Sequence, residues 1–88
     1  MMEKEFVVTP RLGLHARPAA LFVHEAAKFK SAVLVNKEGL EINGKSVMGL
    51  MLLAAECGSR LTIKADGPDE EQAIAALGRL FERKFDED

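Results

Sequence analysis

Pro18 is the residue that most constrains how this chain can fold. Proline has no amide hydrogen and clashes with a preceding helical turn, so it fits an α-helix only within the first turn. Apolar residues follow it at helical spacing: Ala19, Phe22, Val23 and Ala26. The sequence therefore predicts a helix from about Ala16 to Lys28, and His15 falls at its N-cap.

His15 is a poor N-cap in comparison with Ser, Thr, Asp or Asn, so the first amides of this helix have no obvious side-chain partner. The amides of Ala16 and Arg17, together with the positive end of the helix dipole, form a site that suits an anion. The Arg17 guanidinium adds a planar set of donors that matches phosphate. Gly13 gives the backbone freedom to turn just before the histidine. An imidazole nitrogen at this position is placed to accept a phosphoryl group.

Two interpretations of this stretch compete. A lone histidine more often ends a loop, beside a solvated arginine, than takes part in catalysis. The full run at residues 13–19, Gly-Leu-His-Ala-Arg-Pro-Ala, nevertheless resembles the active-site signature of the HPr family. These are the histidine-containing phosphocarrier proteins of the bacterial phosphoenolpyruvate-dependent phosphotransferase system. A second stretch, residues 43–51, resembles another segment of the same family, and the length and order of elements also fit.

The resemblance implies a phosphoryl carrier rather than an enzyme that turns over a small molecule. In the family, enzyme I receives a phosphoryl group from phosphoenolpyruvate and passes it to Nδ1 of the histidine that matches His15. That histidine passes the group to a histidine of an enzyme IIA domain. His15 would accept the group, and Ala16 and Arg17 would bind it. Enzyme I and enzyme IIA domains are the expected partners, and neither a cofactor nor a metal is expected.

Residues 39–46, Gly-Leu-Glu-Ile-Asn-Gly-Lys-Ser, match the letters of a Walker A motif. The residues between the two glycines alternate like a strand, however, and the chain is too short for a P-loop nucleotide-binding domain. We therefore discount nucleotide hydrolysis. Ser46 is instead a suitable N-cap for a short helix that begins at Val47, after a turn at Gly44.

Two roles are compatible at Ser46. A structural cap alone would explain the serine, whereas the resemblance implies phosphorylation by a dedicated ATP-dependent serine kinase, which a helix N-terminus tolerates electrostatically.

The short helix after Ser46 is apolar nearly all round, and methionines make adaptable contact surfaces. By resemblance, four residues would form a partner-docking patch beside the reactive histidine: Ala20, Val47, Met48 and Met51. The competing interpretation is that both methionines only fill the core.

Composition narrows the remaining function classes. Eighty-eight residues, 48% of them apolar and 30% charged, predict one small globular domain spanning residues 1–88. A net charge of −2 and the absence of Trp and Tyr argue against an RNA-binding module. The single cysteine, Cys57, excludes an internal disulfide and is expected to fill apolar space. The longest near-apolar run, residues 47–55, is far shorter than the roughly 20 residues of a membrane helix. We expect a cytoplasmic monomer that binds neither nucleic acid nor membrane.

Alternating faces predict strands at residues 3–9, 31–37, 40–43 and 60–65. A last helix is predicted to begin after Asp69, which forms a capping-box pattern with Gln72. Its buried stripe would consist of Ile74, Leu77, Phe81 and Phe85. This order of elements favours an antiparallel or mixed sheet with one face covered by helices. The resemblance sharpens the fold class to α+β, an open-faced sandwich of a four-stranded antiparallel sheet with three helices packed on one face.

The branch of the phosphotransferase system is a separate question. The lead-in at residues 11–13, the segment 52–55 and the tail at residues 85–88 resemble carriers of the nitrogen-related, regulatory branch. The intact stretch around Ser46 resembles carriers under kinase control. We expect a role in the sugar phosphotransferase system. The alternatives are a regulatory carrier that is not coupled to sugar uptake and a non-transferring interaction module of the same fold.

Overall fold

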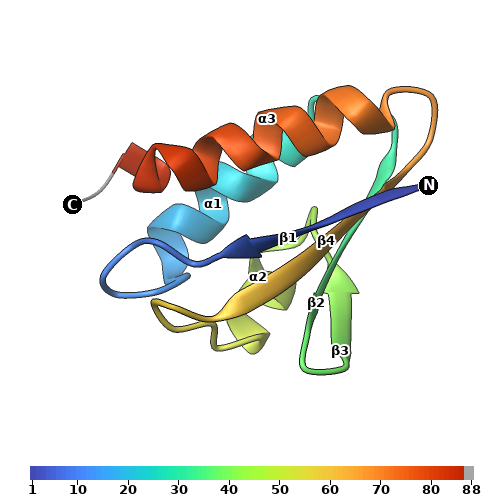
Figure 1. Ribbon diagram of the computed structural model, residues 1–88. Coiled ribbons are helices and arrows are strands. Elements are labelled where there is room, and N and C mark those ends of the chain that lie inside the picture. The colour runs from blue at the N-terminus through green and yellow to red at the C-terminus, as the bar shows by residue number, and fades with distance from the viewer. Residues whose placement is uncertain (87–88) are drawn as a thin grey trace.

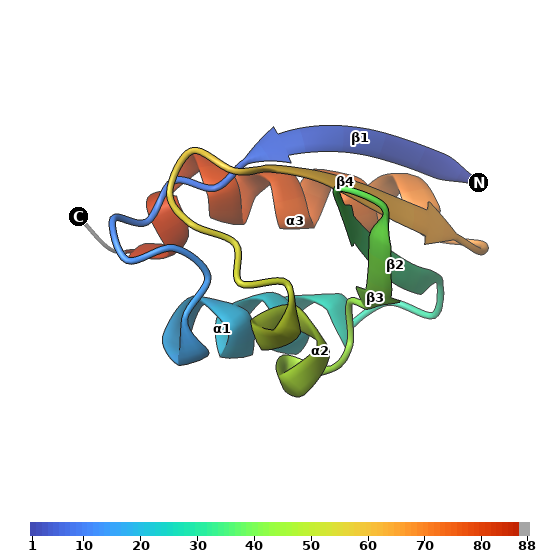
Figure 2. The same ribbon diagram turned by 90° about the horizontal axis from the view of Figure 1, so that it is seen from below.

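The computed structural model describes residues 1–86, so Glu87 and Asp88 of the acidic tail lie outside it. Along the chain, the elements are β1 (Met2–Val7), α1 (Ala16–Ala26), β2 (Ala32–Lys37), β3 (Leu40–Asn43), α2 (Val47–Leu52), β4 (Arg60–Asp66), α3 (Glu70–Glu82) and the 3₁₀ turn η1 (Lys84–Asp86). The strands form one antiparallel sheet in the order β1-β4-β2-β3. The three helices lie on the same side of this sheet (Figure 1, Figure 2). The arrangement confirms the predicted open-faced sandwich.

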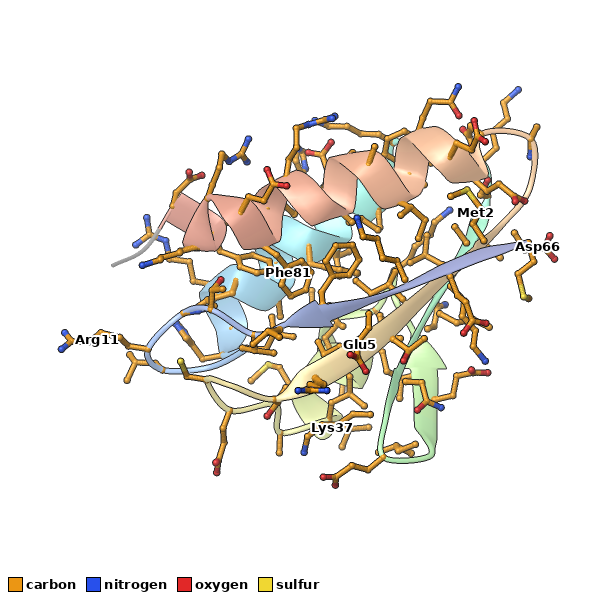
Figure 3. All side chains as sticks on the ribbon, in the orientation of Figure 1. Met2, Glu5, Arg11, Lys37, Asp66 and Phe81 are labelled. Atoms are coloured by element: carbon orange, nitrogen blue, oxygen red, sulfur yellow. The ribbon has the colours of Figure 1, made fainter. Side chains whose placement is uncertain are left out.

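The core lies between the sheet and the helices. Alternate residues of the central strand β4 are fully buried: Leu61, Ile63 and Ala65. Phe81 extends from α3 toward the sheet (Figure 3). Its ring stacks on Phe6 of β1, with the ring centroids 5.0 Å apart. Phe22 of α1 meets the same ring edge-on at 6.4 Å. Phe81 thus joins α1, α3 and the sheet.

Phe85 reaches the core in a way that a helical pattern does not predict. Regular helix ends at Glu82, and the three residues of η1 have positive φ angles of 54°, 53° and 59°. This left-handed turn folds the chain back, so that the Phe85 ring lies edge-on to Phe81 at 4.9 Å and is fully buried. Because non-glycine residues rarely adopt this conformation, the burial of Phe85 has to offset its cost.

Two predicted elements end earlier than expected. The first strand ends at Val7 rather than Thr9, although the Val8 amide still donates to the Ser59 carbonyl at 2.8 Å just beyond it. The first helix ends at Ala26 rather than Lys28. The amide of Lys28 donates to the carbonyl of Glu25, three residues back, at 3.2 Å, so the chain has already tightened out of α-helical geometry.

The capping-box prediction at Asp69 was wrong. Within residues 1–86 its side chain makes no capping hydrogen bond. It accepts instead from the amides of Lys30 and Ser31, each at 2.9 Å, and from the Ser31 hydroxyl. These hydrogen bonds, above all that from the hydroxyl, lower the pKa of Asp69 from 3.8 to about 2. Asp69 therefore ties the start of β2 to the start of α3. Glu70 instead makes the local contact, accepting from the Gly67 amide at 3.1 Å.

Three further expectations meet mixed outcomes. Leu40–Asn43 is a strand, so the Walker-like letters do not form a phosphate-binding loop, as predicted. Cys57 does not fill apolar space: it is exposed in a surface loop, with its thiol 3.7 Å from the Thr9 carbonyl. No helix within residues 1–86 has the length and apolar character needed to cross a bilayer.

Candidate functional site

The candidate site lies at the start of α1, where His15 is the N-cap, as predicted. The His15 backbone is extended (φ −79°, ψ −171°), and its carbonyl accepts the Ala19 amide at 3.0 Å. The His15 side chain makes no capping hydrogen bond, and the first turn contains no acidic residue. Ala16 and Arg17 are exposed. The first turn of α1 therefore supplies no acidic side chain to offset the positive end of the helix dipole.

Burial along α1 fixes which side of the helix meets the core. Pro18, Ala19 and Phe22 are buried, and they anchor α1 in the core, where it packs against α2 and α3. His15 is partly exposed, and Arg17 is fully on the solvent side. The apolar spacing that predicts the helix thus also determines which residues of its first turn can meet a partner.

The loop before His15 is held by the segment that follows α2. Leu14 is buried, and its amide donates to the carbonyl of Ala55 at 2.8 Å. Gly13 has a positive φ of 74°, and its amide donates to the Pro10 carbonyl at 2.9 Å. A Cβ atom on Gly13 would stand only 2.4 Å from the Ala55 oxygen. Both the backbone angle and the close approach therefore require glycine two residues before His15.

Helix α2 begins at Val47, as predicted. Ser46 is its N-cap, and the Ser46 hydroxyl accepts a hydrogen bond from the Gly49 amide at 3.0 Å. Leu50 is fully buried and fixes this short helix on the core. The side chains of Met48 and Met51 are 79% and 47% exposed. The interpretation that both methionines only fill the core is therefore wrong, and they contribute apolar surface to the outside of the molecule.

Helices α1 and α2 pack against each other, which brings the predicted patch residues onto neighbouring elements (Figure 2). Ala20 is exposed on α1, and Val47 is partly buried at the start of α2. Sequence reasoning missed two more exposed apolar side chains, Leu12 at 79% and Leu52 at 72%. A signal for Leu52 was present, since a six-residue helix cannot bury an unbroken run of apolar residues.

Next to His15, the side chains of Ala16 and Arg17 lie at the surface. Arg11, in the loop before His15, extends away from the body of the molecule (Figure 3). Within residues 1–86, no group of three or more His, Cys, Asp or Glu side chains could hold a metal ion. A groove between β1 and α3 is lined in part by Phe6, Ile74 and Arg79, but by none of the predicted site residues. This groove is therefore separate from the candidate site.

Comparison with known proteins gives a consistent result over the whole fold. The family model described as "PTS HPr component phosphorylation site" matches residues 2–83. Phosphocarrier protein HPr from Xylella fastidiosa (strain 9a5c) is 48% identical over 88 residues, 100% of this chain and 99% of that protein. HPr-like protein Crh from Bacillus subtilis (strain 168) is 47% identical over 84 residues, 96% of this chain and 99% of that protein. The crystal structure of HPr-C-His from Thermoanaerobacter tengcongensis has a TM-score of 0.96 at 46% identity and covers 100% of this chain and 99% of that one.

The four-stranded antiparallel sandwich, with Ala16 and Arg17 exposed at the start of α1, defines a small α+β protein. The chain belongs to the HPr family of phosphocarrier proteins of the phosphotransferase system. The resemblance carried by residues 13–19 and 43–51 is thereby confirmed.

Proposed function

We propose that this protein relays a phosphoryl group from phosphorylated enzyme I to enzyme IIA domains through Nδ1 of His15. The observation that carries the proposal is the place of His15 at the start of α1, directly before the exposed residues Ala16 and Arg17. Membership of a phosphocarrier family supports the same role.

The chemistry follows from that position. A neutral imidazole nitrogen of His15 attacks phosphorus with its lone pair while the bond from phosphorus to the donor's imidazole nitrogen breaks, so the donor regains its lone pair. The amides of Ala16 and Arg17 and the Arg17 guanidinium offset the negative charge of the phosphoryl oxygens. Because these groups are exposed, water screens part of their effect. Moderate stabilisation suits a carrier, which has to release the group that it accepts.

We assign partner docking to the apolar surface of the neighbouring helices α1 and α2. Exposed methionines can repack against partners of different shape, which a carrier needs if one surface is to meet both its donor and its acceptors. The docking surface consists of Ala20, Val47, Met48 and Met51, extended along α2 by Leu52.

Labelling by enzyme I tests the accepting residue. The purified chain, incubated with enzyme I and radiolabelled phosphoenolpyruvate, is expected to take up one acid-labile phosphoryl group, and His15→Ala abolishes the label. His24→Ala is the matched control, since His24 is the other histidine of the chain and is exposed on α1, so this variant keeps the label. Full labelling of His15→Ala, or loss of the label in His24→Ala, contradicts the assignment.

We further propose that Ser46 is a site of regulatory phosphorylation by an ATP-dependent serine kinase. Its hydroxyl lies at the start of α2, the helix that presents Met48 and Met51, so a phosphoryl group there adds negative charge beside the docking surface. With such a kinase and ATP, His15→Ala is expected to be labelled and Ser46→Ala is not. Labelling of both variants would place the kinase site elsewhere.

Regulation without onward transfer is the second candidate function. The observation that favours it is the 47% identity to Crh, of which a solution structure is described as the Bacillus subtilis catabolite repression HPr. We place the chain in the sugar branch and expect phosphorylated His15 to pass its group to a sugar-specific enzyme IIA. Transfer only to a nitrogen-related IIA domain supports the regulatory branch, and no transfer to either supports the interaction module.

We also expect the transferring form to be a monomer. Solved relatives from Thermoanaerobacter tengcongensis and Bacillus subtilis are described as dimers, so assembly is measured directly, by light scattering during size exclusion. A dimer that retains full transfer contradicts the expectation.

A further inference from the structure

Ala54 adopts a backbone conformation that its residue type disfavours. It follows Leu53, the C-cap of α2, and has a φ of 49°. Helices commonly end in this left-handed conformation, but glycine is the usual residue there, because a Cβ atom makes it unfavourable. The Ala54 side chain is exposed, so its own burial does not account for the conformation.

The left-handed turn determines where the next residue lies. The Ala54 amide donates to the Met51 carbonyl at 3.1 Å, which ends α2 tightly. The chain then turns so that Ala55 is buried and its carbonyl meets the Leu14 amide at 2.8 Å. Leu14 immediately precedes His15, so the end of α2 is joined to the start of α1 by this hydrogen bond and by the close approach of Gly13.

We propose that the left-handed turn at Ala54 is a positioning element for His15, acting through the hydrogen bond between the Ala55 carbonyl and the Leu14 amide. The inference rests on the proposed relay function and adds to it a residue outside the docking surface. The turn fixes the start of α1 relative to α2, which carries Met48 and Met51. A docked partner then finds the accepting nitrogen already in place, which in-line transfer requires.

Substitution at Ala54 tests this without touching the accepting residue. Ala54→Val keeps an exposed apolar side chain but disfavours positive φ further, whereas Ala54→Gly favours it. Hydrogen exchange of the Leu14 amide is expected to be about tenfold less protected in Ala54→Val, and more protected in Ala54→Gly. Ala75→Val is the control, because Ala75 is also exposed but lies within regular helix α3.

Transfer kinetics separate positioning from mere stability. With phosphorylated enzyme I as donor, well below the unfolding temperature, Ala54→Val is expected to lower kcat several-fold at an unchanged KM, because the docking residues are intact. Ala54→Gly transfers at least as fast as the parent protein, and Ala75→Val is unchanged.

The inference is overturned if Ala54→Gly and the parent protein show the same Leu14 protection, or if Ala54→Val folds and keeps the parent kcat. If Ala54→Val does not fold, the protection of the Leu14 amide in Ala54→Gly decides whether the inference holds. If the parent protein itself accepts no phosphoryl group, the relay function fails, whereas the Leu14 exchange data still decide whether the turn holds the start of α1.

Discussion

Replacement of Gly13 by alanine isolates the contact that holds the loop before His15. Gly13 and Gly39 both have positive φ, at 74° and 89°. They differ in their surroundings: a Cβ atom on Gly13 would lie 2.4 Å from the Ala55 oxygen, whereas nothing stands within 4 Å of a Cβ on Gly39. Gly39→Ala is therefore a matched control that carries the backbone cost without the collision.

The expected loss of stability follows from the backbone conformation of each glycine and from the contacts that an added Cβ atom would break. At Gly39, alanine makes the left-handed backbone conformation less favourable, and a stiffer unfolded chain offsets part of this effect. The free energy of unfolding is therefore expected to fall by about 1 kcal/mol. At Gly13, the collision is with backbone and cannot be relieved by rotating a side chain. Moving the loop breaks the hydrogen bond from Leu14 to Ala55, worth about 1 kcal/mol, and exposes part of the Leu14 side chain, worth about 1–2 kcal/mol. We expect Gly13→Ala to lose about 3–4 kcal/mol in total.

Urea unfolding followed by circular dichroism measures the difference. For a domain of this size, the free energy of unfolding changes by about 1 kcal/mol per molar urea. The midpoint is therefore expected to fall by about 3–4 M for Gly13→Ala and by about 1 M for Gly39→Ala. Midpoints of the two variants within about 0.5 M of each other would refute the reasoning that the Ala55 carbonyl fixes this loop.

Three further predictions concern charge and capping. Arg17→Ala is expected to fold with its unfolding midpoint unchanged, since the side chain is exposed, but to accept a phosphoryl group about ten- to a hundredfold more slowly; an unchanged rate in a rapid-quench assay would contradict this. Ser46→Ala is expected to lose about 1 kcal/mol of stability and Ser46→Asp to lose less, because aspartate also caps helices; equal thermal midpoints for the two variants argue against the cap. Asp69 has a pKa of about 2 in the folded protein and 3.8 ordinarily, so its contribution to stability is present above pH 3.8 and disappears as the pH falls toward 2. Asp69→Asn should therefore show a shallower fall of the urea midpoint over that range, and a fall as steep as the parent's would count against the role of its hydrogen bonds.

Local rules explain why much of the site could be predicted from the sequence. Pro18 fits only a first helical turn, which places His15 at the N-cap. Ser46 has the side chain that a helix start requires, and the predicted hydrogen bond to Gly49 is present. Both features depend on residues within a few positions of each other, where propensity and geometry act together. The strand positions followed from alternation for the same reason.

What could not be predicted depends on contacts between distant parts of the chain. Asp69 has the identity and spacing of a helix cap, but Ser31 competes for its carboxylate from 38 residues away. Phe85 adopts a positive φ because burial of its ring outweighs the local backbone preference. Ala54 does so because the placement of Ala55 in the core outweighs the same preference. The strand order likewise requires the whole sheet. Tertiary packing decides these features, and no short pattern records them.

Amide NMR spectra before and after phosphorylation test the central claim most directly, because they report on the atoms that are said to hold the phosphoryl group. When enzyme I and phosphoenolpyruvate convert the protein to its phosphorylated form, the account predicts that the amide resonances of Ala16 and Arg17 shift more than any others outside His15. Unchanged Ala16 and Arg17 amides in a fully phosphorylated sample, with the largest shifts elsewhere on the surface, would contradict it.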